Sequence, residues 1–318
     1  MYSIAIILPV FNGGNYLQAS VKSVLTQLGA DFELLVIDDC STDGSREWLE
    51  SIYDNRLKLF KNDVNRGLFY NLNFLINHSS APLIKLWAQD DIMNPGCLEA
   101  FVSFYQNHQD VGFIYCNREV IDEYGEITSG IKTDVTPKII STAYHNHVAW
   151  FTGSIAGNIA NVCLVRDAIN AVGLFNEKMK ISGDFDIQAR LAQKFDTGFI
   201  NQPLIKLRNH SGQLSRNSTY YFLHVKEDLA VFKFILNSIP LQQQQAGKKD
   251  LRRYKLMFYY TLMLKALGGA QFGLFGKYLK QLSSFDNIFL LTVEYIKQKV
   301  FKVKRPFKKF HTATQYIS

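Results

Sequence analysis

The first half of the chain alternates short apolar runs with segments of helical periodicity. The runs typical of buried strands are residues 4–10, 33–38, 57–61, 82–88 and 111–117, and the helical segments between them are 16–27, 45–53, 68–77 and 95–107. A strand that is followed by a helix usually returns as a parallel neighbour through a right-handed crossover. The alternation therefore predicts an α/β fold with a doubly wound, mostly parallel sheet.

The second half has a different pattern. It is irregular between 118 and 160, and from about 219 onward it has the periodicity of amphipathic helices at 220–237, 249–267 and 287–301, with a glycine-rich break at 268–273. A length of 318 residues is enough for one large α/β domain and an appendage. We expect a domain over 1–220, with halves at about 1–117 and 118–220, and a helical, basic extension over 221–318.

The net charge of +7 is unevenly distributed. Residues 1–225 contain 18 Lys and Arg against 23 Asp and Glu, whereas residues 226–318 contain 17 against 5. Between Lys297 and Phe310 the basic residues are interleaved with phenylalanines, which suits an anionic membrane surface. A solvated helix face with a frayed tail is the alternative. No nucleic-acid-binding motif accompanies the charge, so we expect no nucleic acid partner.

The four cysteines are widely scattered and form no CxxC pair, which is typical of reduced thiols in the cytoplasm. The N-terminal residues lack the basic start of a signal peptide and are better interpreted as a first strand. No uncharged apolar run reaches the roughly 18 residues of a spanning helix. We therefore expect a cytoplasmic protein that lies peripherally on the inner face of the membrane.

Two of the strand-like runs lead into paired carboxylates. The run 33–38 leads into Asp38 and Asp39, and the run 82–88 is followed by Asp90 and Asp91. Buried carboxylates are costly unless they meet a metal or a polar ligand, and ligands of open α/β sheets bind at the carboxyl ends of the strands. The pattern predicts one site for a divalent cation and a phosphorylated nucleotide. Turn capping by Asp38 or Asp39 is the alternative, although Asp43 is better placed for it.

Two other nucleotide-binding classes lack their motifs. A dehydrogenase needs GxGxxG after the first strand, and residues 12–15 are Asn-Gly-Gly-Asn. A P-loop needs Ser or Thr after Gly276-Lys277, where this chain has Tyr278. Two alternatives remain: a nucleotidyltransferase-like enzyme, which here lacks a basic glycine-rich loop near the first strand, and a catalytically inactive nucleotide-sugar binding module.

Six motifs follow one another in a characteristic order. They are Leu8-Pro9-Val10-Phe11-Asn12, Asp38-Asp39-Cys40-Ser41-Thr42-Asp43-Gly44, Asn65-Arg66-Gly67, Gln89-Asp90-Asp91, Gly183-Asp184-Phe185-Asp186 with Arg190, and Arg208-Asn209-His210-Ser211-Gly212. Together they resemble family 2 glycosyltransferases of the bacterial surface-polysaccharide type, over roughly residues 3–216. The resemblance implies a GT-A fold and an inverting transfer of one sugar from a nucleotide donor.

The resemblance also implies a donor site. Asp39 would accept a hydrogen bond from a uracil-like base, while Pro9, Val10 and Asn12 would line the base and ribose. Asp90 would contact the ribose or the metal shell. In the family an acidic residue usually precedes the Gln89-Asp90-Asp91 motif by one position, where this chain has Ala88, which implies a thinner metal shell.

For the metal, the resemblance makes Asp91 the ligand of Mg²⁺ or Mn²⁺, with His210 completing the shell or contacting the diphosphate. Such a cation stabilises the diphosphate leaving group. A helix cap before Pro95 is the alternative for the acidic pair, and a surface or core position is the alternative for His210.

Asp184 matches the position of the general base that takes the proton of the acceptor hydroxyl, as a single displacement requires. Its position at a helix start could also explain it, because a carboxylate there is stabilised by the free amides and the helix dipole. The resemblance also implies the substrates: a UDP-linked donor and a hydroxyl acceptor on a glycan or lipid-linked sugar, in polysaccharide biosynthesis. The presence of Asp39, Asp91, Asp184 and His210 together argues against the inactive binding module.

Overall fold

The computed structural model describes residues 2–129, 135–212, 220–299 and 301. The chain divides into two compact units, each described separately here. The first comprises Met1–Thr142 and Ala156–Gln213, and the second comprises Ala143–Ile155 and Leu214–Ser318. The sequence predicts a single domain boundary near residue 220. It carries no signal that the short segment Ala143–Ile155 belongs to the second unit.

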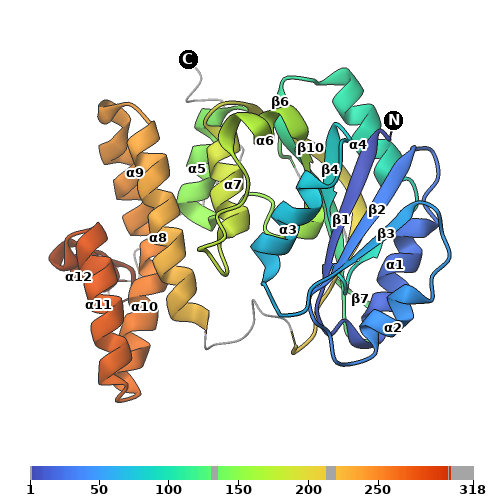
Figure 1. Ribbon diagram of the computed structural model, residues 1–318. Coiled ribbons are helices and arrows are strands. Elements are labelled where there is room, and N and C mark those ends of the chain that lie inside the picture. Colours follow the sequence, from blue (N-terminus) through green and yellow to red (C-terminus); the bar gives the residue numbers. More distant parts are fainter. Residues whose placement is uncertain (1, 130–134, 213–219, 300, 302–318) are drawn as a thin grey trace. The chain divides into compact units, whose positions relative to one another are not determined.

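The first unit is an α/β layer structure. Its helices are η1 (Gly14–Tyr16), α1 (Leu17–Leu25), α2 (Ser45–Glu50), α3 (Leu68–Asn77), α4 (Cys97–Asn107), η2 (Ile159–Asn161), α6 (Arg166–Val172) and α7 (Gly183–Ala192). Its strands are β1 (Ile4–Val10), β2 (Phe32–Asp38), β3 (Leu57–Lys61), β4 (Leu83–Leu86), β5 (Ile92–Met93), β6 (Val111–Ile121), β7 (Ile127–Ser129), β8 (Ile139–Ile140), β9 (Val162–Val165) and β10 (Asp196–Arg208). Helix α3 covers one face of the β1–β2 region, and α1 and α2 cover the other (Figure 1).

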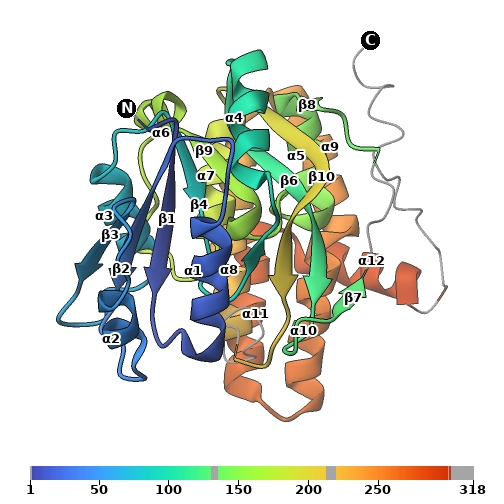
Figure 2. The same cartoon turned by 90° about the vertical axis from the view of Figure 1, so that its right-hand side faces the viewer.

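The strands form one sheet in the order β3-β2-β1-β4-β9-β6-β10-β5, with β7 paired to β6 and β8 paired to β10. The first four strands are parallel, as the alternation of strands and helices predicts. Strand β9 is antiparallel to both β4 and β6, which makes the whole sheet mixed. Figure 2 shows the long strands β6 and β10 side by side. The carboxyl ends of β1, β2 and β4 therefore share one edge.

The core of this unit follows from the apolar runs. Every residue of β2 is buried, and in β1 only Pro9 is partly exposed. Such continuous apolar strands are expected in a parallel sheet that is covered on both faces. Lys85 of β4 is a charged residue within this core: it is 0% exposed and donates hydrogen bonds to the carbonyl oxygens of Leu86 and Ala160. Lys85 therefore pins β4 to the segment that leads into β9.

The second unit is helical. It contains α5 (Thr142–Thr152), α8 (Tyr221–Ser238), α9 (Leu241–Arg253), α10 (Lys255–Gly268), α11 (Phe272–Phe285) and α12 (Ile288–Lys299). The ring of Phe151 on α5 lies 4.1 Å from the ring of Tyr254, and Trp150 lies 6.4 Å from Phe232, which explains why α5 belongs with these helices. The glycine-rich break predicted at 268–273 is the turn between α10 and α11. Within the described residues, no helix has the length and apolarity to span a bilayer.

Candidate active site

The loops that follow β1 and β2 hold each other in place. The backbone N–H of Asn12 donates to Oγ of Ser41 at 2.9 Å, and the N–H of Thr42 donates to Oδ1 of Asn12 at 2.9 Å. Asn12 has a φ of +49°, a left-handed conformation that asparagine tolerates better than most residues. Asp43 accepts hydrogen bonds from the N–H groups of Gly14 and Ser45, so it is the capping residue of this turn. These bonds fix the shape of the sheet edge beside Pro9 and Val10.

Asp39 lies at this edge and is 3% exposed. Its Oδ1 accepts hydrogen bonds from the N–H of Arg66 at 2.7 Å and from Nδ2 of Asn62 at 2.8 Å, and its Oδ2 accepts one from the N–H of Gly67 at 2.9 Å. Carboxylate oxygens can each accept two hydrogen bonds, so Oδ2 can accept a further N–H from a ligand. The neighbouring Asp38 is paired with Arg46 at 2.7 Å and has a structural role.

The acidic pair follows β4, and its two members have different surroundings. Asp91 is 1% exposed, and its Oδ1 accepts a 2.8 Å hydrogen bond from the N–H of Arg208. Its Oδ2 is buried and has no hydrogen-bond partner in the described part of the protein. Burial, with a smaller contribution from the charge of Asp90, raises the pKa of Asp91 to about 8. A buried carboxylate oxygen without a partner is costly, and a cation would relieve that cost.

Asp90 is more accessible and faces the end of β10. Its Oδ2 lies 2.9 Å from Nε2 of His210. Tyr16 lies beside the pair, with its ring 4.9 Å from the ring of His210 and 4.6 Å from the guanidinium carbon of Arg208. Asp90 and His210 are therefore in contact, and Arg208 links Asp91 to the same end of β10.

Arg208 is the residue that joins these parts, and its own role could not be predicted from the sequence. Its side chain donates to the carbonyl oxygens of Asp90, Asp122 and Glu123 at 3.0–3.1 Å. It therefore connects the acidic pair to the turn between β6 and β7. Its position two residues before His210 was the only signal in the sequence, because the contact with Asp91 spans 117 positions.

The donor set fits a cation that is shared with a phosphate group. No cluster of three or more His, Cys, Asp or Glu side chains able to hold a metal occurs among the described residues. Mg²⁺ is commonly held by one or two carboxylates, with substrate phosphates and water completing its shell. The orphaned Oδ2 of Asp91 has the chemistry of such a ligand atom, and the next carboxylate in the chain, Asp90, is paired with His210.

Asp184 lies in the first turn of α7 and is partly exposed. The N–H of Phe185 donates to its Oδ1 at 2.8 Å. Asp186, two residues later, forms a 2.8 Å ion pair with Arg190, whose guanidinium also donates to the backbone carbonyls of residues 172–174. Asp186 therefore fixes the helix start, and Asp184 lies partly exposed in the same first turn.

A glycine permits the close approach between α7 and α3. A Cβ atom at Gly183 would lie 2.6 Å from Cζ of Phe69, which is a distance that real Cβ atoms do not show. Phe69 follows Gly67 at the start of α3, and Gly67 donates to Asp39. The candidate base is thus connected through packed neighbours to the segment that surrounds Asp39.

Gln89 is a second residue whose role the sequence did not reveal. Its Oε1 accepts a hydrogen bond from the N–H of Phe11 at 2.9 Å, and its Nε2 donates to the carbonyl oxygen of Phe11 at 3.0 Å. The side chain of Phe11 is 46% exposed beside Val10 and Asn12. The residue before the acidic pair therefore holds the end of β1 in register with the end of β4.

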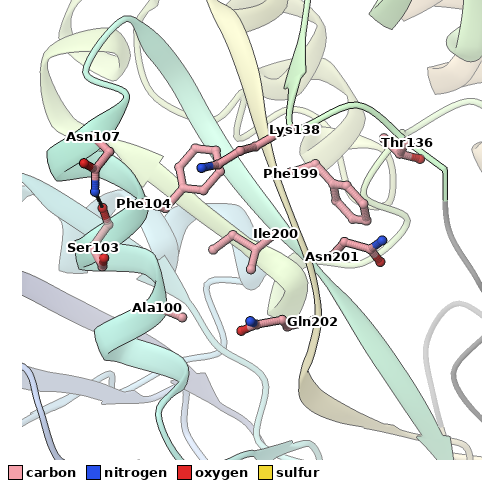
Figure 3. A pocket seen from close by; sticks show the side chains of 10 residues that line it. All are labelled: Ala100, Ser103, Phe104, Asn107, Thr136, Lys138, Phe199, Ile200, Asn201 and Gln202. Carbon is pink, nitrogen blue, oxygen red and sulfur yellow. Dashed lines mark hydrogen bonds between the residues drawn. The ribbon is translucent and has the colours of Figure 1, made fainter.

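A pocket of about 450 Å³ lies elsewhere on the first unit (Figure 3). Its lining residues come from α4, from the middle of β10 and from the segment before β8: Ala100, Ser103, Phe104, Asn107, Thr136, Lys138, Phe199, Ile200, Asn201 and Gln202. None of the site residues expected from the sequence lines it. The candidate active site is therefore the polar edge of the sheet and not this pocket.

Comparisons with known proteins agree with this geometry. The family model for glycosyl transferase family 2 matches residues 5–181, which is more than half of the chain. An uncharacterized glycosyltransferase of Rickettsia conorii is 30% identical over 217 residues, covering 67% of this chain and 35% of the relative. The protein belongs to glycosyl transferase family 2.

A named relative is the Escherichia coli UDP-Glc:alpha-D-GlcNAc-diphosphoundecaprenol beta-1,3-glucosyltransferase WfgD. It is 34% identical over 121 residues, covering 38% of this chain and 47% of the relative. The chain thus spans about a third to a half of the length of these two curated relatives.

Solved structures show the fold. Staphylococcus aureus TarS 1–349 in complex with UDP-GlcNAc has a TM-score of 0.58 at 15% identity, covering 78% of this chain and 79% of that one. The mannosyltransferase PcManGT from Pyrobaculum calidifontis, in complex with GDP-Man and Mn²⁺, has a TM-score of 0.52 at 15% identity, covering 94% of this chain and 88% of that one. The GT-A fold expected from the sequence motifs is confirmed.

Proposed function

We propose that the protein is an inverting glycosyltransferase that moves one sugar from a nucleotide-diphosphate donor, UDP-linked, to a hydroxyl group of a glycan or lipid-linked acceptor. The observation that carries the proposal is the arrangement at one sheet edge of Asp39, with a free acceptor position on Oδ2, and of Asp91, with an orphaned Oδ2. Oδ2 of Asp39 is suited to accept the N–H of a nucleotide base, and Oδ2 of Asp91 is suited to bind a cation that is shared with a diphosphate.

Each residue has a separate role in this proposal. Asp39 accepts the base N–H, while Pro9, Val10 and Asn12 line the base and ribose. Asp91 is the ligand of a divalent cation, Mg²⁺ or Mn²⁺, and the cation when bound neutralises charge that gathers on the diphosphate. Asp90, which is paired with His210, contacts the ribose or the metal shell, and His210 completes that shell or contacts the diphosphate.

Asp184 takes the proton of the acceptor hydroxyl, which lets the oxygen attack the anomeric carbon from the side opposite the diphosphate. The attack forms the new glycosidic bond as the bond to the diphosphate breaks, and the configuration at the anomeric carbon inverts. Asp186 and Arg190 keep the start of α7 in place and hence position Asp184.

The named relatives and neighbours support the class of donor and acceptor. The TarS structure contains UDP-GlcNAc, and the name of WfgD states a UDP-glucose donor and a diphosphoundecaprenol-linked acceptor. By analogy we assign this protein to bacterial polysaccharide biosynthesis, on the inner face of the membrane where a lipid-linked acceptor would be met. The basic tail that the sequence suggested for membrane contact, beyond Phe301, lies outside the described residues.

The test is a panel of UDP-, GDP- and dTDP-sugars incubated with the protein and Mg²⁺ or Mn²⁺. Release of the nucleoside diphosphate from one of them, abolished by a chelator, is expected. A nucleotidyltransferase would instead form a nucleotide sugar and pyrophosphate from a nucleoside triphosphate and a sugar phosphate, and an inactive binding module would be stabilised by a donor without cleaving it. Either result would contradict the proposal.

A further inference from the structure

Helices α10, α11 and α12 expose lysines and no carboxylate among their described residues. Their two acidic residues, Asp286 and Glu294, are only 5% and 7% exposed. Asp286 is neutralised by Arg252, with two hydrogen bonds of 2.7 and 2.9 Å. The exposed lysines of these helices are Lys265, Lys277, Lys280, Lys297 and Lys299. None of these five has a carboxylate within ion-pair distance in the part of the chain that the structure describes.

The same helices expose large apolar side chains. Phe258 on α10, Phe272 at the start of α11 and Phe289 on α12 are 58%, 68% and 70% exposed. Exposed apolar side chains that gather into a patch mark surfaces that contact a partner or a membrane. The lysines and these three phenylalanines together are called the docking face below.

Helix α12 has a buried side and an exposed apolar side. Leu291 is fully buried and Glu294 is nearly so, and they form the side that packs into the unit. Phe289 and Ile296, seven residues apart, lie on one side of the helix and are 70% and 39% exposed. An inward face accounts for the fold of the unit, and the outward face has no partner among the described residues.

We propose that the docking face binds the surface of a bilayer that contains anionic phospholipid. Lysines attract an anionic surface, and exposed aromatic rings enter the boundary between headgroups and acyl chains. The absence of any exposed carboxylate from α10–α12 in the described chain removes the repulsion that such a surface would otherwise meet. The inference rests on the proposed function, since a lipid-linked acceptor requires the enzyme to work at a membrane.

A bilayer fits the docking face better than an acidic protein does. Hot-spot rings of protein interfaces typically fill pockets. The pocket of about 290 Å³ described in this unit is lined by residues of α8, α9 and α11, and none of the three phenylalanines is among them. Rings distributed over three helices and interspersed with lysines are typical of interfacial helices.

The experiment is sedimentation of the full chain with vesicles of phosphatidylcholine and phosphatidylglycerol, compared with vesicles of phosphatidylcholine alone. Binding to the anionic vesicles is expected at low salt and should weaken strongly as salt rises. The variant Lys265→Gln/Lys277→Gln/Lys280→Gln should bind more weakly, by about fivefold for each charge removed. The variant Phe258→Ser/Phe272→Ser/Phe289→Ser should also bind more weakly, at every salt concentration.

Two controls locate the surface. Lys22→Gln/Tyr53→Ser removes an exposed lysine and a 98% exposed ring from the first unit, and it should bind as the parent chain does. Replacing Lys302, Lys304, Lys308 and Lys309 by Gln in the full chain tests the tail separately. If only that variant loses binding, or if both helix variants sediment like the parent, the docking face is refuted.

Donor hydrolysis in solution separates this inference from the proposed function. Every surface variant should release nucleoside diphosphate at the parent rate, because the donor-site residues all lie in the first unit. If the docking face binds anionic vesicles but the protein hydrolyses no donor, the proposed function is refuted and the membrane-binding inference is supported. If the protein hydrolyses a donor but does not bind anionic vesicles, the membrane-binding inference is refuted and the proposed function is supported.

Discussion

The backbone N–H of Arg208 donates a 2.8 Å hydrogen bond to Oδ1 of Asp91 and so joins the end of β10 to the acidic pair after β4. The other carboxylate oxygen, Oδ2, is buried and has no partner among the described residues. One oxygen is therefore used for positioning, while the other is left for a ligand. This division explains why a single carboxylate can be both a structural element and the expected cation ligand.

The first prediction is that Asp91→Asn abolishes cation-dependent transfer. An amide keeps an acceptor for the N–H of Arg208 but offers no charge to a cation, so kcat/KM should fall by at least about 100-fold. Asp91→Ala leaves the N–H of Arg208 without its acceptor in a buried position, so it should also destabilise the fold by about 1–3 kcal/mol. Donor turnover with Mn²⁺ and thermal melts measure both effects. Full activity of Asp91→Asn in chelator would refute the assignment.

The second prediction concerns nucleotide binding. Asp39→Asn replaces the carboxylate that the base N–H would meet, so the KM for the donor should rise about 10–100-fold, the usual range for loss of a charged hydrogen bond. Asn62→Ala is the matched variant, because it removes only one of the three donors that hold Asp39. It should change the KM less than Asp39→Asn does. Equal effects of the two would mean that Asp39 only braces its neighbours.

The third prediction concerns the base. Asp184→Asn keeps the shape of the side chain but cannot accept a proton, so kcat should fall by roughly 10²–10⁴-fold with donor affinity nearly unchanged. Isothermal titration with the donor and steady-state rates measure the two quantities. The NMR coupling constant of the product's anomeric proton should report inverted configuration. A product of retained configuration would exclude the in-line displacement.

The local sequence pattern was sufficient to predict several helices and strands of the first half of the α/β domain, residues 1–117. The predicted bounds of β1, β3 and α3 coincide with those of the structure, because each element has the apolar periodicity of its type and ends at a turn. Strand β9 could not be predicted, since a four-residue apolar run becomes a strand only when β4 and β6 bind it on both sides. Helix α11 was missed because its glycines weaken the helical pattern.

In the candidate site, too, some residues could be predicted from the sequence and others could not. The motifs could select Asp39, Asp91 and Asp184 as candidates, because these carboxylates stand at the ends or starts of predicted elements. The partners of these carboxylates come from distant positions: Arg208 reaches Asp91 across 117 residues, and Asn62 reaches Asp39 across 23. Such contacts are set by tertiary packing, for which a single sequence carries no periodic signal.

The fourth prediction tests how α7 is placed. Gly183→Ala should push α7 away from Phe69, because the new Cβ would lie 2.6 Å from its ring. Overpacking of this kind costs about 1–3 kcal/mol of folding stability. Displacement of Asp184 should also lower kcat by about tenfold. Adding Phe69→Leu makes room and should restore part of both losses. A double mutant that loses as much as the sum of the two single variants would show that the contact does not position Asp184.

The last prediction is a pH dependence of stability in the helical unit. His145 on α5 is fully buried, and burial lowers its pKa to about 4. In the unfolded chain a histidine takes up its proton near pH 6.5, so between about 6.5 and 4 the unfolded state binds more protons than the folded state. Stability should therefore fall as the pH is lowered through that window, by up to about 3 kcal/mol for this residue.

The measurement is urea unfolding followed by circular dichroism at several pH values. His145→Gln has no titrating ring, so its stability should fall less steeply between pH 6.5 and 4 than that of the parent. Part of the slope should remain, because burial also lowers the pKa of His147 on the same helix. Parallel curves for the two proteins over this range would contradict the prediction, since the only titrating group that differs between them is the buried imidazole.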